Sequence, residues 1–182
     1  MELFISSIFF LIKNFSKMIR PLTTNDVDEF IRVRKAALVN HPFSFGASPH
    51  RIIDKKQTAI DLANKNEENF ILGYFDEAQL IGMVGFMRYN EKRIHKGIIW
   101  GMYVDKNYQG KGIGQKLMEM TIAKVKQIKG LTKINLSVTH LSKAAFHLYQ
   151  KLGFTVYGRE IAASYWNGIA MDEIFMDLML DN

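Results

Sequence analysis

The segment YVDKNYQGKGIG, residues 103–114, carries three alternate glycines and a lysine between an apolar run and a helix-like pattern. Glycines let a backbone approach a bulky anion closely because no Cβ intervenes. The first turn of a helix adds unpaired backbone N–H groups and a dipole that favours negative charge. This combination suits a phosphate group, although a tight turn that binds nothing would use the same residues.

Two common phosphate motifs do not fit this turn. A Walker A loop requires Ser or Thr after Gly-Lys, whereas Lys111 is followed by Gly112. A dinucleotide fingerprint requires Gly-x-Gly-x-x-Gly, whereas Gln115 occupies the last place. These mismatches argue against an unrelated nucleotide-binding enzyme. A third pattern, Gln/Arg-x-x-Gly-x-Gly/Ala, fits Gln109, Gly112 and Gly114.

The elements around this turn predict one α/β domain. Periodicity and turn residues predict strands near 18–23, 69–75, 79–89, 98–104, 133–138, 154–158 and 172–180, and helices near 24–38, 51–64, 113–129 and 142–152. Hairpins at both ends and a right-handed crossover at the glycine turn indicate a layered, partly antiparallel sheet. Strict alternation would place one face of the strand before the turn at Ile98, Trp100, Met102 and Val104, and the other at Ile99, Gly101 and Tyr103.

Composition limits the function classes. The 182 residues include no cysteine, which excludes disulfides, thiolate metal sites and a cysteine nucleophile. The net charge of +6 comes from scattered lysines, so it indicates a solvated surface or a polyanionic ligand rather than nucleic acid. The apolar run 8–12 is too short to span a membrane and lacks the flanks of an export signal. We therefore expect an N-terminal extension, residues 1–17, a single domain over 18–182, and a cytoplasmic location.

Two blocks of the chain resemble the GNAT superfamily of acyl-CoA-dependent N-acetyltransferases. IIWGMYVDKNYQGKGIGQKLM is similar to that family's cofactor strand, loop and helix. LSVTHLSKAAFHLYQKLGF is similar to its next strand and helix, with the signature Leu148, Tyr149, Gly153 and Phe154. The likeness runs from about Met18 to the C-terminus. It implies a mostly antiparallel sheet of about seven strands, helices on both faces and splayed central parallel strands.

The resemblance implies transfer of an acetyl group from acetyl-CoA to a primary amine by direct attack, without a metal. The acceptor is either a small molecule or a protein amino group. The residues that it places on the cofactor are Met102, Tyr103, Val104, Gln109, Gly110, Lys111, Gly112, Ile113, Gly114, Gln115 and Ser142. The backbone of 110–115 would hold the pyrophosphate, and Met102 and Val104 would pair with the pantetheine arm. Many family members have asparagine in place of Ser142, and serine there is equally a helix N-cap.

Tyr149 matches the family tyrosine that protonates the departing CoA sulfur. It also lies on an apolar helical stripe with Ala145, Leu148 and Leu152, so a purely structural role is the alternative. An ordinary tyrosine pKa of about 10 suits a proton donor to a thiolate only where geometry assists.

The general base is less well defined. His140, after the 133–138 strand, is our leading prediction, and the other candidates are Glu91, His95, Asp172 and Glu173.

The acceptor side is predicted from a resemblance between residues 41–50 and the family's acceptor loop. Phe43 and Phe45 would line the acceptor site, although both could instead be core aromatics. Tyr165 and Trp166 would form either a lid or a dimer contact, so the sequence does not decide between a monomer and a homodimer. The alternative to an enzyme is a non-catalytic acyl-CoA sensor that uses the same cradle.

Overall fold

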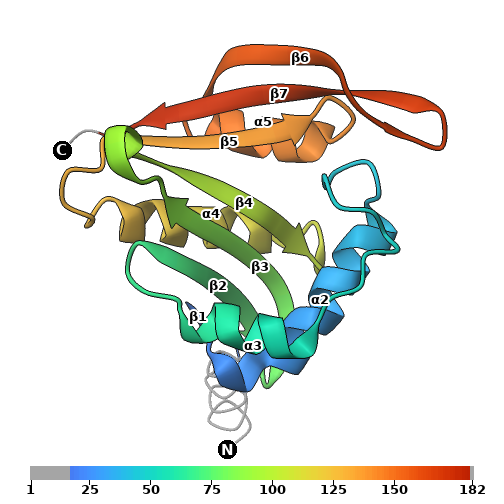
Figure 1. Cartoon of the computed structure of the whole chain (residues 1–182), viewed down its shortest axis with the longest axis vertical. Coiled ribbons are helices and arrows are strands. Elements are labelled where there is room, and N and C mark those ends of the chain that lie inside the picture. The colour runs from blue at the N-terminus through green and yellow to red at the C-terminus, as the bar shows by residue number, and fades with distance from the viewer. Residues whose placement is uncertain (1–16, 181–182) are drawn as a thin grey trace, which may run out of the picture.

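The computed structural model describes residues 17–180, which form one seven-stranded sheet with helices on both faces (Figure 1). The strands are β1 (Lys17–Pro21), β2 (Asn69–Asp76), β3 (Gln79–Arg88), β4 (Lys96–Val104), β5 (Lys133–Thr139), β6 (Thr155–Trp166) and β7 (Ile169–Met179). The α-helices are α2 (Val27–Asn40), α3 (Lys55–Ala63), α4 (Ile113–Val125) and α5 (Lys143–Lys151). The order across the sheet is β1-β2-β3-β4-β5-β7-β6. Among these residues, no helix is long and apolar enough to cross a membrane.

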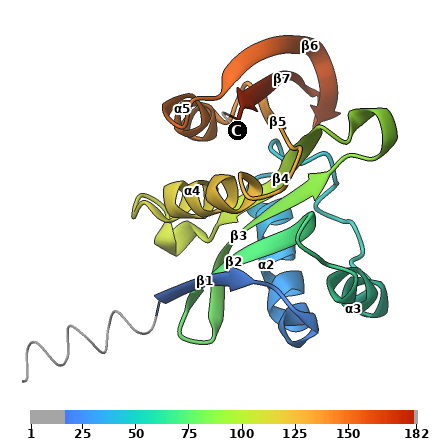
Figure 2. The same cartoon turned by 90° about the vertical axis from the view of Figure 1, so that its left-hand side faces the viewer.

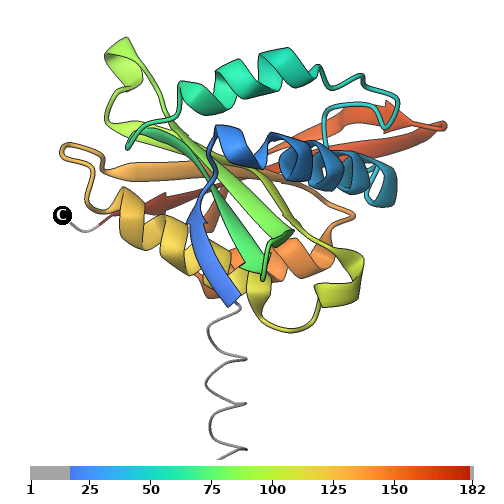
Figure 3. The ribbon, with the colours of Figure 1, turned by 90° about the horizontal axis from the view of Figure 1, so that it is seen from below.

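The helices cover the sheet in two layers. Figures 2 and 3 show α2 and α3 on one face and α4 and α5 on the other. The sequence of β3 explains this arrangement, because apolar residues occupy both of its faces. Leu80 and Met83 pack in the cluster beneath α2, while Ile81 and Val84 pack in the cluster beneath α4. The sheet is therefore buried on both sides along β3, the strand that supports β4.

The sheet opens at its centre. Every neighbouring pair is antiparallel except β4 and β5, which run parallel. These two strands pair only through Lys96–Ile98 and Lys133–Asn135. Beyond that point they diverge (Figure 1), and the rest of β5 pairs with β7 on its other side. The second half of β4 therefore presents a free backbone edge to the gap.

A β-bulge re-aims the second half of β4. Trp100 pairs with Gly85 and Tyr103 pairs with Met83, so β4 has one residue more than β3 over this interval. The extra residue allows Gly101 to adopt a φ of +65°, which glycine tolerates best. The strict alternation that we expected along β4 is therefore wrong beyond Gly101. Trp100 and Tyr103 lie on the α2 face, whereas Met102 packs on the α4 face.

The predicted fold class is confirmed: the sheet is mixed, mostly antiparallel and splayed between its two parallel strands. Two expectations need correction. β6 is much longer than 154–158 and ends at Tyr165 and Trp166, and β7 begins at Ile169 instead of Asp172. The helices expected over 51–64 and 113–129 are shorter, at Lys55–Ala63 and Ile113–Val125. The expected extension 1–17 lies outside the described residues except for Lys17, which begins β1.

A buried carboxylate fixes the entry of the chain into α2. Asp26 is 6% exposed, accepts two 2.7 Å hydrogen bonds from Arg20, and forms a capping box with Thr23. Arg20 and the Thr23 hydroxyl and amide lower the pKa of Asp26 from its ordinary value. A carboxylate with a lowered pKa stabilises the fold above its unfolded pKa of about 3.9, and this stabilisation is lost as pH falls.

Asp26→Asn is expected to lower the free energy of unfolding at pH 7 by about 2 kcal/mol, since hydrogen bonds to a charged group are lost. Urea denaturation at pH 7 and pH 3 measures this effect. The difference between variant and wild type should shrink at pH 3, where the wild-type carboxyl is itself becoming protonated. An equal difference at both pH values would mean that the charge of Asp26 is irrelevant.

Candidate functional site

The site is built around the free edge of β4. The amide of Asp105 donates to the carbonyl of Ile81, which directs Asp105 toward β3. Because successive residues of an antiparallel strand alternate in direction, the backbone groups of Met102 and Val104 point away from β3, into the gap. A free strand edge of this kind can pair with an extended ligand.

The glycine turn lies where β4 meets α4. Gly110 and Gly112 both have a φ of +74°, and a Cβ added to either would meet no atom of residues 17–180 within 4 Å. The first intrahelical hydrogen bond of α4 runs from Lys116 to the Gly112 carbonyl at 3.1 Å. The backbone N–H groups of 110–115 have no hydrogen-bond partner within residues 17–180. The turn thus directs several free donors outward at a helix N-terminus, which suits a diphosphate.

The third glycine of the turn has a different role. A Cβ on Gly114 would lie 2.6 Å from the Met102 methyl carbon and 3.6 Å from a Leu148 methyl carbon. The absence of a side chain at Gly114 therefore lets α4 approach β4 and α5 closely. Ile113, beside it, is buried in the core, so only the Ile113 backbone remains for a ligand.

The side chains predicted around the cradle mostly bind the protein itself. Gln109 donates to the Val104 carbonyl at 2.9 Å, which occupies one of the outward groups of β4. Lys111 donates to the Asn107 carbonyl at 3.0 Å, and Gln115 accepts from Lys151 of α5 at 3.0 Å.

Tyr103 is buried on the α2 face. There its hydroxyl is 3.1 Å from the Asn40 amide, and its ring meets the His41 ring edge-on at 5.8 Å. The Tyr103 side chain is thus turned away from the α4 cradle, and only its backbone belongs to the β4 edge.

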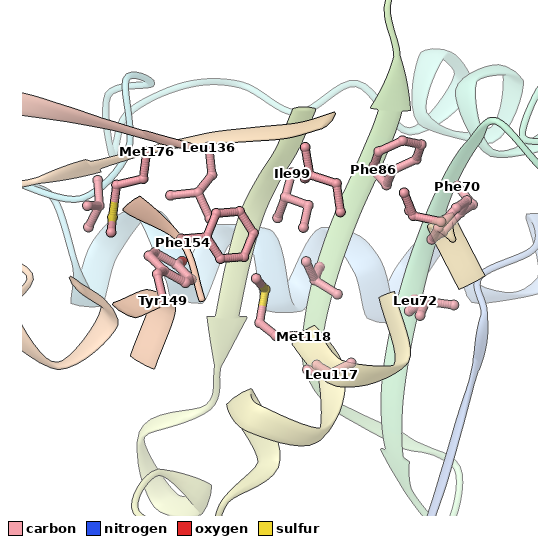
Figure 4. Close-up of a cluster of buried hydrophobic side chains, with 14 of the residues drawn as sticks. Phe70, Leu72, Phe86, Ile99, Leu117, Met118, Leu136, Tyr149, Phe154 and Met176 are labelled. Carbon is pink, nitrogen blue, oxygen red and sulfur yellow. The ribbon is translucent and has the colours of Figure 1, made fainter. Parts of the chain in front are cut away.

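Tyr149 belongs to α5, and its side chain packs in the core between this helix and the sheet. Figure 4 shows it beside Phe154, with Leu136 and Met176 nearby. The Tyr149 side chain is in the core, with its residue 6% exposed, and desolvation raises its pKa to about 12. Its hydroxyl makes no hydrogen bond within residues 17–180, yet it is not among their fully enclosed unpaired polar atoms. The hydroxyl therefore keeps contact with solvent and its proton at neutral pH, as a proton donor requires.

His140 is held by the backbone of β7. Its Nδ1 accepts a 3.0 Å hydrogen bond from the Asp172 amide, and its own amide donates to the Asp172 carbonyl at 3.0 Å. A neutral imidazole that accepts at Nδ1 carries its proton on Nε2. His140 then has no free lone pair with which to accept a proton from an amine. This geometry argues against our prediction of His140 as the general base.

The other base candidates lie in different places. Glu91 and His95 precede β4, at the closed end of the β4–β5 pair, because the Thr132 amide donates to the His95 carbonyl there. Asp172 is bonded to Arg159 and to the Ala162 amide, and these contacts lower its pKa. Among residues 17–180, the Glu173 carboxylate is hydrogen-bonded only to the Ser137 hydroxyl of β5. Of the candidates beside the open end, Glu173 keeps the freest carboxylate.

The loop between α2 and α3 reaches across to α5. The hydroxyls of Ser44 and Ser142 are 2.7 Å apart, and Ser142 makes no side-chain hydrogen bond to its own helix. Ser142 therefore joins the loop to α5 instead of capping it. Phe45 packs against the α2-side core, whereas Phe43 is half-buried in the same loop. The loop thus borders the gap on the face opposite α4.

One charged residue of this region was not among the predicted site residues. Arg34 lies on α2, four residues after Phe30 and four before Leu38, so it interrupts the apolar line of that helix. Its guanidinium stacks 5.0 Å from the Phe45 ring, and its NH1 atom is buried without a hydrogen-bond partner among residues 17–180. A cation on the buried face of a helix was the signal that could have revealed it. Among the same residues, no cluster of acidic or histidine side chains could hold a metal.

Comparisons with known proteins agree with this geometry. The model of the acetyltransferase (GNAT) family matches residues 31–154, which include β4, the glycine turn and α5. A mycothiol acetyltransferase from Propionibacterium freudenreichii is 27% identical over 143 residues, which is 75% of this chain and 42% of that protein. A probable spermine N(1)-acetyltransferase from Bacillus subtilis is 34% identical over 92 residues, covering 48% of this chain and 60% of the other. The chain therefore spans about half the length of these curated relatives.

Solved structures share the whole architecture. A GNAT acetyltransferase from Streptococcus pneumoniae superposes with a TM-score of 0.83 at 23% identity, over 90% of this chain and 99% of that one. A putative acetyltransferase from Salmonella typhimurium, solved with its cofactor acetyl-CoA, gives a TM-score of 0.78 at 22% identity, over 91% and 95%. The family match covers more than half of the chain and includes both signature blocks, and the fold agrees: this chain belongs to the GNAT acetyltransferase family.

Proposed function

We propose that this protein transfers the acetyl group of acetyl-CoA to a primary amine by direct attack of the amine on the thioester. The observation that carries this proposal is the joining of a phosphate-type cradle at 110–115 to the free edge of β4. A pyrophosphate on the one and an extended pantetheine arm along the other would form one continuous binding path. The relatives' names support the same reaction class, and we place the activity in the cytoplasm, where acetyl-CoA is supplied.

In this proposal the chain performs three tasks on the reacting atoms. Amide groups at the free edge of β4 hold the arm and stabilise negative charge as it develops on the thioester oxygen. The Tyr149 hydroxyl donates a hydrogen bond to the departing sulfur. A thiol pKa of about 8.5 lies well below that of Tyr149, so this hydrogen bond stabilises the thiolate without complete proton transfer.

The third task is removal of a proton from the amine. We assign it to Glu173, which lies on β7 beside the strand that borders the gap. Within the described part of the chain, its carboxylate is hydrogen-bonded only to Ser137. His140 could take this role only by releasing the Asp172 amide. The mutants Glu173→Gln and His140→Gln separate the two: the first should lose turnover and the second should retain most of it.

The activity itself is tested by CoA-thiol release from acetyl-CoA across amino acids, polyamines, aminoglycosides and N-terminal peptides. The proposal expects release that depends on one class of amine. Tight acetyl-CoA binding without turnover on any amine would instead support a sensor that uses the same cradle. Preference for ATP or NAD over acetyl-CoA in a binding competition would contradict both.

A further inference from the structure

Arg34 of α2 lies half-buried over the ring of Phe45, in the loop that follows α2. Two other arginines of the chain have acidic partners: Arg20 pairs with Asp26 and Arg32 pairs with Glu29. Arg34 has no such partner among residues 17–180, and its NH1 atom is enclosed with no hydrogen bond. Burial, with a further contribution from Arg51, lowers its pKa from the ordinary value. Enclosing part of a guanidinium without a hydrogen-bond partner or counter-ion costs folding free energy. Such groups are therefore rare unless a ligand completes the site.

The position of Arg34 indicates which ligand it meets. NH1 lies 3.5 Å from where a Cβ of Gly101 would be, so the guanidinium abuts the bulge that begins the free edge of β4. It approaches from α2, on the sheet face opposite the cradle of α4. The aromatic rings of Phe45 and Trp100 pack in the same α2-side cluster. Arg34 therefore faces the side from which the amine would approach the thioester.

We infer that Arg34 binds a carboxylate of the acceptor, so that the acceptor is an α-amino acid or a close analogue. This inference rests on the proposed acetyltransferase function. A guanidinium recognises a carboxylate through paired N–H donors. In an α-amino acid one carbon separates the carboxylate from the amine, so a carboxylate on Arg34 holds the amine beside β4. A polyamine would bring positive charge toward Arg34 and Arg51 and is disfavoured.

The test measures kcat and KM for a panel of L-amino acids, each beside its carboxamide, and for spermidine. Wild type should prefer the best amino acid over its carboxamide by at least about 10-fold in kcat/KM, as expected for a hydrogen-bonded charge pair. Arg34→Met should remove this preference by raising KM for the amino acid, with KM for acetyl-CoA changed less than about 3-fold. Arg34→Lys should keep part of it. Lys35→Met, an exposed neighbour with the same charge change, is the control.

The melting temperature of the Arg34→Met variant is a second measurement. Arg34→Met should leave the melting temperature of the ligand-free protein unchanged or raise it, because a half-buried guanidinium with one enclosed, unpaired nitrogen is removed. A rise in KM for acetyl-CoA in Arg34→Met would assign Arg34 to the cofactor and overturn the inference. Equal use of carboxamides or spermidine by wild type would also overturn it and leave the acetyltransferase function intact.

If no amine is acetylated, the proposed function fails. Calorimetry then still tests whether Arg34 binds the carboxylate of an amino acid. L-Amino acids should bind the wild-type protein in the presence of CoA and should not bind Arg34→Met. Binding by neither protein would overturn the inference.

Discussion

Gly112→Val is expected to weaken acetyl-CoA binding about 100-fold. Gly112 has a φ of +74°, and its missing Cβ faces open space at the mouth of the cradle. A valine there would occupy the space in which the diphosphate meets the backbone donors, and two charge-assisted hydrogen bonds lost at about 1.5 kcal/mol each amount to roughly that factor. Calorimetric titration with acetyl-CoA measures the change.

The matched control is Gly168→Val. Gly168, in the turn between β6 and β7, has a φ of +78° and equally open space around its missing Cβ. Both variants should lose about 1–2 kcal/mol of stability because a branched residue is forced into the left-handed region. Only Gly112→Val should lose affinity. Equal acetyl-CoA affinities of the two folded variants would mean that the cradle at 110–115 does not bind the cofactor.

Tyr149→Phe is expected to reduce kcat roughly 10- to 1000-fold with little change in acetyl-CoA affinity. This range lies below the roughly 100- to 10,000-fold of full acid–base catalysis, because the hydroxyl donates a hydrogen bond without complete proton transfer. The hydroxyl is the only group removed, and it makes no hydrogen bond within residues 17–180, so stability should barely change. Tyr74→Phe is the control, since Tyr74 is equally buried at 6% in the same core cluster. Full activity in Tyr149→Phe would move the donor role to water.

The pKa of the Tyr149 hydroxyl predicts how kcat and stability depend on pH. Burial raises the pKa of Tyr149 to about 12, so its protonated form persists throughout the range in which enzymes are assayed. No fall in kcat between pH 8 and 10 should come from Tyr149, and any fall that remains in Tyr149→Phe belongs to another group. A folded pKa above the unfolded value of about 10 stabilises the protein at lower pH, and this stability is lost as pH rises toward 12.

Much of the fold follows from local signals in the sequence. The apolar runs of β2 and β3, the Gly153 that ends α5 with a φ of +91°, and the glycine turn before α4 each specify their own element. The long β6–β7 hairpin was harder to predict because β6 is a largely exposed edge strand interrupted at Ala162, so its alternation is weak. Asn167 and Gly168, both with positive φ, are the hairpin signal within it.

The parts of the site that escaped prediction depend on three-dimensional contacts. One extra residue at Gly101 exchanges the faces of β4, and no sequence pattern counts residues against a partner strand. The lone pair of His140 is used by a backbone amide from β7, a strand distant in sequence. The apolar line of α2 marks Arg34 as unusual, but only the structure shows that its neighbours are Phe45 and Gly101 and that no acidic side chain of residues 17–180 pairs with it.

Acetyl transfer to an amine can be observed directly by mass spectrometry of the reaction products. The purified protein is incubated with acetyl-CoA and the amine panel, and the masses of both the amine and the protein are measured. We expect an N-acetylated amine in amounts equal to the CoA released, with no acetyl group on the protein, as direct attack requires. Release of CoA without an acetylated amine, or acetyl-CoA that stays bound and intact with every amine, would contradict the proposed transfer.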